Sequence, residues 1–115
     1  MNQDERVRLL QASPLFHGCS KRQLKAVAKL TRVVLIGPGE ALISTGAPST
    51  DAYVITAGSA EVQRRGGKGA ALGPGYVVGE LGLLLERPRN ATVRATTPLE
   101  ALALNRADLR AAVMA

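Results

Sequence analysis

The amino-acid sequence predicts a mainly β domain with helices at both ends: a sandwich, a jelly roll or a small barrel. Between residues 32 and 104, short apolar or alternating segments are separated by turns rich in glycine and proline. Outside that region, apolar residues recur at helical spacing. The chain has 115 residues, of which 46% are hydrophobic, so it is long enough for one domain with its own core.

Residues 1–31 are predicted to form helices. Two sets of residues at helical spacing define their faces: Val7, Leu10 and Gln11, and then Leu24, Val27 and Ala28. Asp4 would cap the first helix, Ser13-Pro14 interrupts the pattern, and Ser20 would cap the second helix.

Residues 32–104 are predicted to form seven or eight short strands. The apolar or alternating segments are 33–36, 52–56, 59–64, 70–72, 92–96 and 99–104. Turn signals lie between them, including a hairpin turn at 65–68. Residues 105–115 would begin a C-terminal helix, with Asn105 and Asp108 as a capping pair and Leu109, Ala112 and Val113 on its apolar face.

The charge and the rare residue types exclude several classes of function. The net charge is +6, but the basic residues are scattered apart from a row on one predicted helix: Lys21, Arg22, Lys25 and Lys29. We interpret this row as a solvated face, with docking of an acidic partner domain as the alternative. Three aromatic residues are too few for stacking many bases, so we expect no direct nucleic-acid binding by this chain.

The single cysteine, Cys19, and the single histidine, His17, argue against a metal site and against a cupin-like metal enzyme. One cysteine also excludes an internal disulfide and is typical of a reducing compartment. No apolar run approaches the ~20 residues of a membrane span, and the polar first residues do not resemble a signal segment. We therefore expect a cytoplasmic protein.

The segment 79–93 interrupts the strand pattern and carries the chemistry. After Gly79, the residues from Glu80 onward are predicted to form one or two helical turns, whose N-terminal N–H groups suit an anion. Arg89 follows a proline and offers a planar fork for phosphate oxygens. The residues alone leave a second interpretation open, in which Arg89 makes a surface ion pair with Glu86 or Glu80.

This segment resembles the phosphate-binding cassette of the cyclic nucleotide-binding domain family, which includes regulatory subunits of cAMP-dependent kinase, catabolite activator type regulators and cyclic-nucleotide-gated channels. The matching residues are Gly79-Glu80-Leu81-Gly82-Leu83 and Pro88-Arg89-Asn90-Ala91-Thr92-Val93. Further matches follow the family's order along nearly the whole chain: Pro14-Leu15-Phe16, Pro38-Gly39-Glu40, Tyr53-Val54-Ile55 and Leu72-Gly73-Pro74-Gly75. The resemblance implies a single domain, 1–115, folded as a jelly-roll-like β-roll with its cassette at 79–93.

The resemblance also implies the roles of the site residues. Glu80, helped by the backbone of Gly79, would bind the ribose 2′-hydroxyl, and Arg89 would pair with the exocyclic phosphate. The remaining expected contacts are the backbone N–H groups of Leu81, Asn90 and Ala91 and the apolar side chains of Val62 and Val78.

The function implied by the resemblance is that of a regulatory domain, not an enzyme. It would bind a cyclic nucleotide, cAMP in preference to cGMP, use no other cofactor, and transmit a conformational change to an output domain of a larger protein. The chain departs from the family at Asn90, where many cAMP-binding members have Ala or Ser. We also expect the C-terminal lid helix to be missing or truncated. The alternative is a degenerate member that acts as an interaction module without binding nucleotide.

Overall fold

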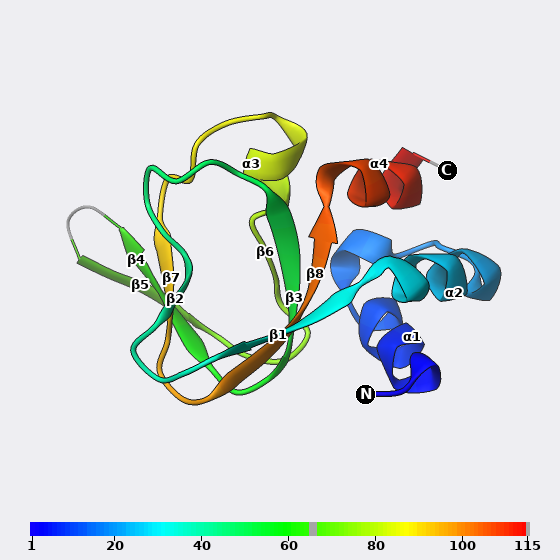
Figure 1. Cartoon of the computed structure of the whole chain (residues 1–115), viewed down its shortest axis with the longest axis horizontal. Helices are drawn as coiled ribbons and strands as arrows, with labels where there is room; N and C mark the ends of the chain where they lie inside the picture. The colour runs from blue at the N-terminus through cyan, green and yellow to red at the C-terminus, as the bar shows by residue number, and fades with distance from the viewer. Residues whose placement is uncertain (65–66, 115) are drawn as a thin grey trace.

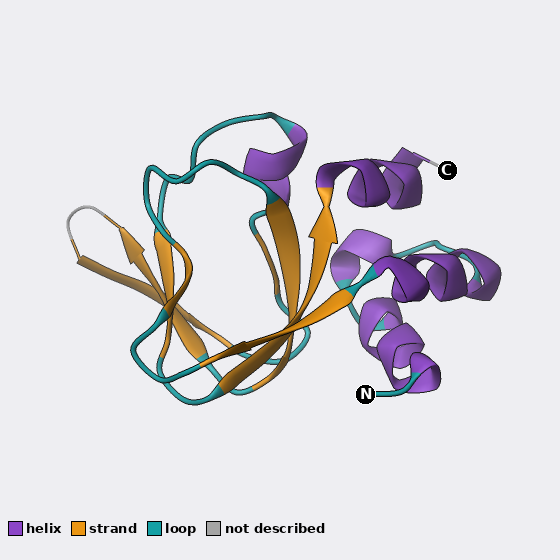
Figure 2. Ribbon diagram, in the orientation of Figure 1, coloured by secondary structure: helices purple, strands orange, loops and turns teal. Residues whose placement is uncertain are grey.

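Two four-stranded antiparallel sheets form most of the molecule, and their strand orders are β1-β8-β3-β6 and β2-β7-β4-β5. The computed structural model describes residues 1–64 and 67–114. Its elements are α1 (Gln3–Gln11), η1 (Pro14–Phe16), α2 (Lys21–Leu30), β1 (Arg32–Ile36), β2 (Ala41–Ile43), β3 (Asp51–Ala57), β4 (Ala60–Arg64), β5 (Gly67–Leu72), β6 (Val77–Val78), α3 (Glu80–Leu84), β7 (Thr92–Ala95), β8 (Leu99–Asn105) and α4 (Arg106–Met114). The sheets face each other, and α1, η1, α2 and α4 gather beside one of them (Figures 1 and 2). The predicted class, a mainly β fold with flanking helices, is confirmed as a β-roll.

Strands β3 and β8 contribute to two separate cores. Val54 lies opposite Leu102, and the next pair is Ile55 opposite Ala101. Because successive side chains of a strand point to opposite faces, Val54 and Leu102 pack in the core shared with the helices. Ile55 and Ala101 pack in the core between the two sheets. This shared pair of strands joins the helical part of the molecule to the β-roll.

The helix caps agree with the sequence analysis except at the first helix. Ser20 and Gln23 form a complete capping box at α2, as expected from Ser20. The prediction that Asp4 caps α1 is wrong. Asn2 is the N-cap, because its side-chain oxygen accepts a hydrogen bond from the N–H of Glu5 at 2.8 Å, and Asp4 lies in the first helical turn.

At the C-terminal helix, the side chain of Asn105 accepts a hydrogen bond from the N–H of Asp108 at 2.9 Å, as predicted. Leu109 is fully buried in the helical core. The side chains of Ala112 and Val113, and two residues of the hairpin turn predicted at 65–68, lie outside the described part of the chain.

Candidate functional site

The segment between β6 and β7 leaves the β-roll through a turn that only glycine fits well. Gly79 has φ +83°, a conformation that other residues rarely adopt. A Cβ atom at this position would lie 2.5 Å from Nη1 of Arg89, so the missing side chain also makes room for the guanidinium group. The five-residue helix α3 follows at once, and its first residue is Glu80.

The second half of the segment between β6 and β7, which includes Arg87 and Arg89, is held by hydrogen bonds to the loop between β2 and β3. The N–H of Arg89 donates to the carbonyl of Ala47, and its own carbonyl accepts from the N–H of Gly46. The hydroxyl of Ser49 donates to the carbonyl of Arg87 at 2.6 Å. Backbone contacts on both sides therefore hold the main chain of Arg89 in place.

The guanidinium of Arg89 is buried and held by backbone carbonyls. The whole residue is only 8% exposed. Nη1 donates to the carbonyl of Gly79 at 2.8 Å, and Nη2 donates to the carbonyl of Asp51. The carboxylate of Asp51 instead pairs with Arg32 at 2.9 Å. Arg89 is therefore oriented by neutral acceptors from the cassette and from β3.

The guanidinium of Arg89 carries a buried positive charge. Within the described part of the chain, Arg89 makes no ion pair with a carboxylate. Burial lowers the pKa of its guanidinium from the ordinary value, because removal from water disfavours the charged form. Its neighbours Tyr53, Asp51 and Glu80 partly oppose that effect. A bound anion would relieve the cost of burying this charge.

A cavity of about 580 Å³ opens beside this guanidinium. Its walls come from β2, β4, β5, β6, β7 and the segment 79–91, and Glu80 and Arg89 both line it. Val62, Leu72, Val78 and Val93 supply apolar wall. The site thus combines a carboxylate, a guanidinium and an apolar surface, a combination suited to a ligand with hydroxyl, phosphate and ring groups.

The structure brings most of the residues predicted for the site into one place. The residues of that set that line the cavity are Gly79, Glu80, Arg89, Asn90, Ala91, Val62 and Val78. The backbone of Leu81 lies in the first turn of α3, and its side chain is outside the described part.

Sequence reasoning missed several cavity residues and all the partners of Arg89 outside the cassette. Arg64 lines the cavity and stands two positions after Val62 on β4, so strand alternation would have found it. Leu72 and Val93, on β5 and β7, were missed as well. Asp51 comes from β3, and no local spacing predicts its contact with Arg89.

A second cavity, of about 750 Å³, lies between η1 and the turn before β6. Glu80 and Val77 line both cavities. Glu80 is the single charged residue among those that line the larger one as described. An anion would meet only a carboxylate there, so the smaller cavity beside Arg89 is the candidate site.

The surface ion pair considered from the sequence is absent among the described residues. Glu86 points instead to α4, where its carboxylate lies 3.8 Å from Nε of Arg106 and 3.7 Å from Nη2 of Arg110. Arg106 also donates to the carbonyls of Leu83 and Ser49, at 2.8 and 3.2 Å. Arg89 therefore lines the cavity without pairing with Glu86. The segment 79–93 instead contacts α4 through Glu86 and Leu83.

Other kinds of site find no support in residues 1–64 and 67–114. No helix in these ranges is long and apolar enough to cross a membrane. The same residues contain no group of three or more His, Cys, Asp or Glu side chains arranged to hold a metal ion.

Comparison with known proteins identifies the family. The family model for the cyclic nucleotide-binding domain matches residues 33–115, and the chain belongs to this family. A cyclic nucleotide-gated potassium channel of Mesorhizobium japonicum is 30% identical over 102 residues, which are 89% of this chain and 28% of the channel. A cAMP-dependent protein kinase regulatory subunit of Schizosaccharomyces pombe is 36% identical over 93 residues, which are 80% of this chain and 23% of the subunit.

A solved structure supports the same family assignment. The catabolite activator protein of Thermus thermophilus has a TM-score of 0.80 and 32% identity, covering 89% of this chain and 50% of that one. The chain spans between 11% and 28% of the length of the curated relatives compared with it. It is therefore a cyclic nucleotide-binding domain homologous to regulatory domains of kinases and channels.

Proposed function

We propose that the cavity beside Arg89 binds a cyclic nucleotide, with cAMP preferred over cGMP, and that the domain reports this binding without catalysing a reaction. Arg89 pairs with the exocyclic phosphate. Glu80 accepts a hydrogen bond from the ribose 2′-hydroxyl, and Gly79 contributes its backbone. The N–H groups of Leu81, Asn90 and Ala91 complete the phosphate contacts. Val62 and Val78 contact the sugar and base.

The observation that carries this proposal is the buried guanidinium of Arg89, which lines an open cavity without a carboxylate partner among the described residues. A buried charge is stabilised by an opposite charge, and a hydrogen bond from an arginine to a phosphate is stronger than one between neutral groups. The preference for cAMP is carried over from the family resemblance. Asn90 itself selects neither base, because it is neither the Ala or Ser of many cAMP-binding members nor the Thr that often accompanies cGMP binding.

Calorimetric titration with cAMP, cGMP and linear 5′-AMP tests the proposal. We expect cAMP to bind most tightly. Tighter binding of cGMP would overturn the base preference. No binding of either cyclic nucleotide would overturn the proposed function, and would leave an interaction module that binds no nucleotide.

The Glu80→Gln variant tests the role of the carboxylate. It should weaken cAMP binding by roughly 10-fold or more, because a hydrogen bond to a charged acceptor contributes about 1.5–3 kcal/mol. It should leave binding of 2′-deoxy-cAMP nearly unchanged, since that ligand lacks the hydroxyl. Glu86→Gln is the matched control, because Glu86 is exposed in the same segment and does not line the cavity. Unchanged discrimination between the two ligands in Glu80→Gln would show that Glu80 has only a structural role.

We also propose that ligand binding moves α4, which would carry the signal to an output domain. The support is the contact of Arg106 with Leu83, Ser49 and Glu86, which links α4 to both segments that hold Arg89. In the wild-type domain, cAMP should shift the amide NMR resonances of α4, and in Arg106→Gln it should bind but shift them less. Equal shifts in both proteins would exclude Arg106 as the link.

A further inference from the structure

Helix α2 carries a row of exposed cations. Its ten residues include four cations and no acidic residue. We call this row the α2 basic stripe, and it consists of Lys21, Arg22, Lys25 and Lys29. All four side chains are exposed, and none belongs to an ion pair within the part of the chain that is described.

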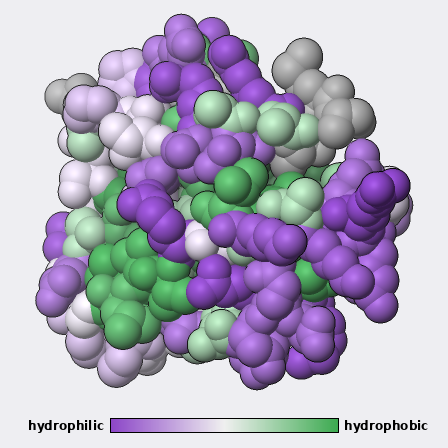
Figure 3. Space-filling view, turned by 45° about the vertical axis from the view of Figure 1, so that its right-hand side comes forward, coloured by the Kyte–Doolittle hydropathy of each residue, from purple (hydrophilic) through white to green (hydrophobic). Residues whose placement is uncertain are grey.

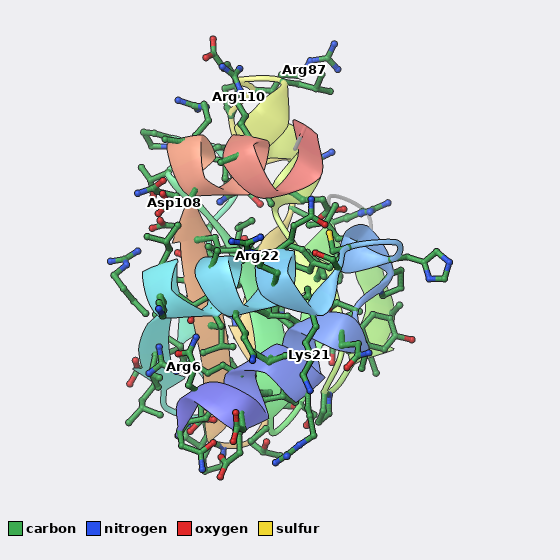
Figure 4. All side chains as sticks on the ribbon, turned by 90° about the vertical axis from the view of Figure 1, so that its right-hand side faces the viewer. Arg6, Lys21, Arg22, Arg87, Asp108 and Arg110 are labelled. Atoms are coloured by element: carbon green, nitrogen blue, oxygen red, sulfur yellow. The ribbon has the colours of Figure 1, made fainter. Side chains whose placement is uncertain are left out.

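The stripe is concentrated on one side of the helix. At about 100° per residue, its four members fall within an arc of about 100°, and successive lysines stand about 6 Å apart along the axis. The apolar side of α2, with Leu24 and Val27, is buried in the helical core. Figure 4 places Lys21 and Arg22 on the outer face formed by α1, α2 and α4. In the space-filling view, hydrophilic surface dominates the side where these helices lie (Figure 3).

The first two members of the stripe, Lys21 and Arg22, oppose the helix dipole, whereas Lys29, in the last turn, is favourably placed. Cations near a helix N-terminus face its partial positive charge and destabilise the helix, whereas acidic residues there stabilise it. Helices α1, α3 and α4 each have an acidic residue in the first turn, but α2 begins with Lys21 and Arg22. Lys21 and Arg22 thus occupy an unfavourable position without an ion pair to compensate for it in the described part of the chain. Such a local conflict is expected at a functional surface.

We propose that the α2 basic stripe is a docking surface for an acidic helical segment of a partner protein. Carboxylates four residues apart on a partner helix repeat at the same spacing as Lys21, Lys25 and Lys29, so the charges match along the stripe. Insertion of α2 into a lipid bilayer is disfavoured because the apolar side of the helix is already buried. Helix α2 lies at the opposite end of the molecule from β4 and β5 (Figure 1), so this surface is separate from the nucleotide cavity.

The test compares binding of two blocked, alanine-based helical peptides with either glutamate or glutamine at every fourth position. The wild-type domain should bind the glutamate peptide and not the glutamine peptide. The Lys21→Glu/Lys25→Glu variant should lose about 10-fold or more in affinity for the glutamate peptide at about 0.15 M salt. Arg64→Glu/Arg87→Glu changes the net charge equally but lies on the cavity side, and should lose less than about 2-fold.

A stability measurement separates docking from a structural role. Lys21→Glu should raise Tm by about 1–4 °C, because it replaces an unfavourable charge at the N-terminus of α2. The proposal is overturned if Tm falls in this variant, if both double variants lose affinity equally, or if the glutamine peptide binds as well. It is also overturned if vesicles containing phosphatidylserine, or a DNA duplex, bind in a stripe-dependent way while the glutamate peptide does not.

Discussion

The Arg89→Ala variant is expected to bind cAMP roughly 30- to 700-fold more weakly than the wild-type domain. The side chain offers a charge-assisted, two-pronged contact from a buried position, and losing such a contact costs about 2–4 kcal/mol. The conservative Arg89→Lys variant keeps the charge but not the fork that reaches the carbonyls of Gly79 and Asp51, so it should also bind more weakly. Calorimetric titration measures both effects.

Arg94→Ala is the matched control for Arg89→Ala. Arg94 also holds a backbone carbonyl, that of Gly39 at 2.7 Å, but it does not line the cavity. Its loss should therefore affect stability and leave cAMP affinity nearly unchanged. If Arg89→Ala is folded and binds cAMP as tightly as Arg94→Ala, then Arg89 does not hold the phosphate.

The Gly58→Ala variant is expected to lose on the order of 3 kcal/mol or more of folding stability, which corresponds to a fall in Tm of roughly 10 °C or more. Gly58 has φ +84° in the turn between β3 and β4. A Cβ there would collide with the backbone carbonyl of Pro98 and would lie 3.0 Å from Cα of Leu99. Because these are backbone atoms, a side-chain rotation cannot relieve the clash. Thermal unfolding followed by circular dichroism measures the loss.

Gly39→Ala separates backbone strain from the clash. Gly39 also has φ +84°, but a Cβ there would meet nothing within 4 Å. It should therefore show only the strain of the left-handed conformation, about 1–2 kcal/mol. Similar Tm values for Gly58→Ala and Gly39→Ala would contradict the close approach of Gly58 to the backbone of Pro98 and Leu99.

The features that the sequence predicted well are those encoded by neighbouring residues. Ser20 and Asn105 cap helices through contacts three residues away. Glu80 and Arg89 share one short segment, so their convergence on a cavity follows from the local motif. At α1, by contrast, the prediction named Asp4, although Asn2 is an equally good capping residue and is the one that caps the helix.

The features that escaped prediction depend on contacts between distant segments. The position of Arg89 depends on Ala47, in the loop between β2 and β3, and on Asp51, the first residue of β3. The link of Arg106 to Ser49 likewise joins residues 57 positions apart. Such contacts are set by the assembled sheets, and no periodicity along the chain reports them.

Because β3 and β8 contribute side chains to both hydrophobic cores, the helical part and the β-roll cannot be separated without exposing one of the cores. Detaching the helices would expose Val54 and Leu102 to water, and opening the sandwich would expose Ile55 and Ala101 on the same two strands. The amide hydrogens of β3 and β8 should accordingly exchange only through global unfolding. A fragment that keeps one core and discards the other would retain these strands with one face bare, an arrangement that favours aggregation over folding.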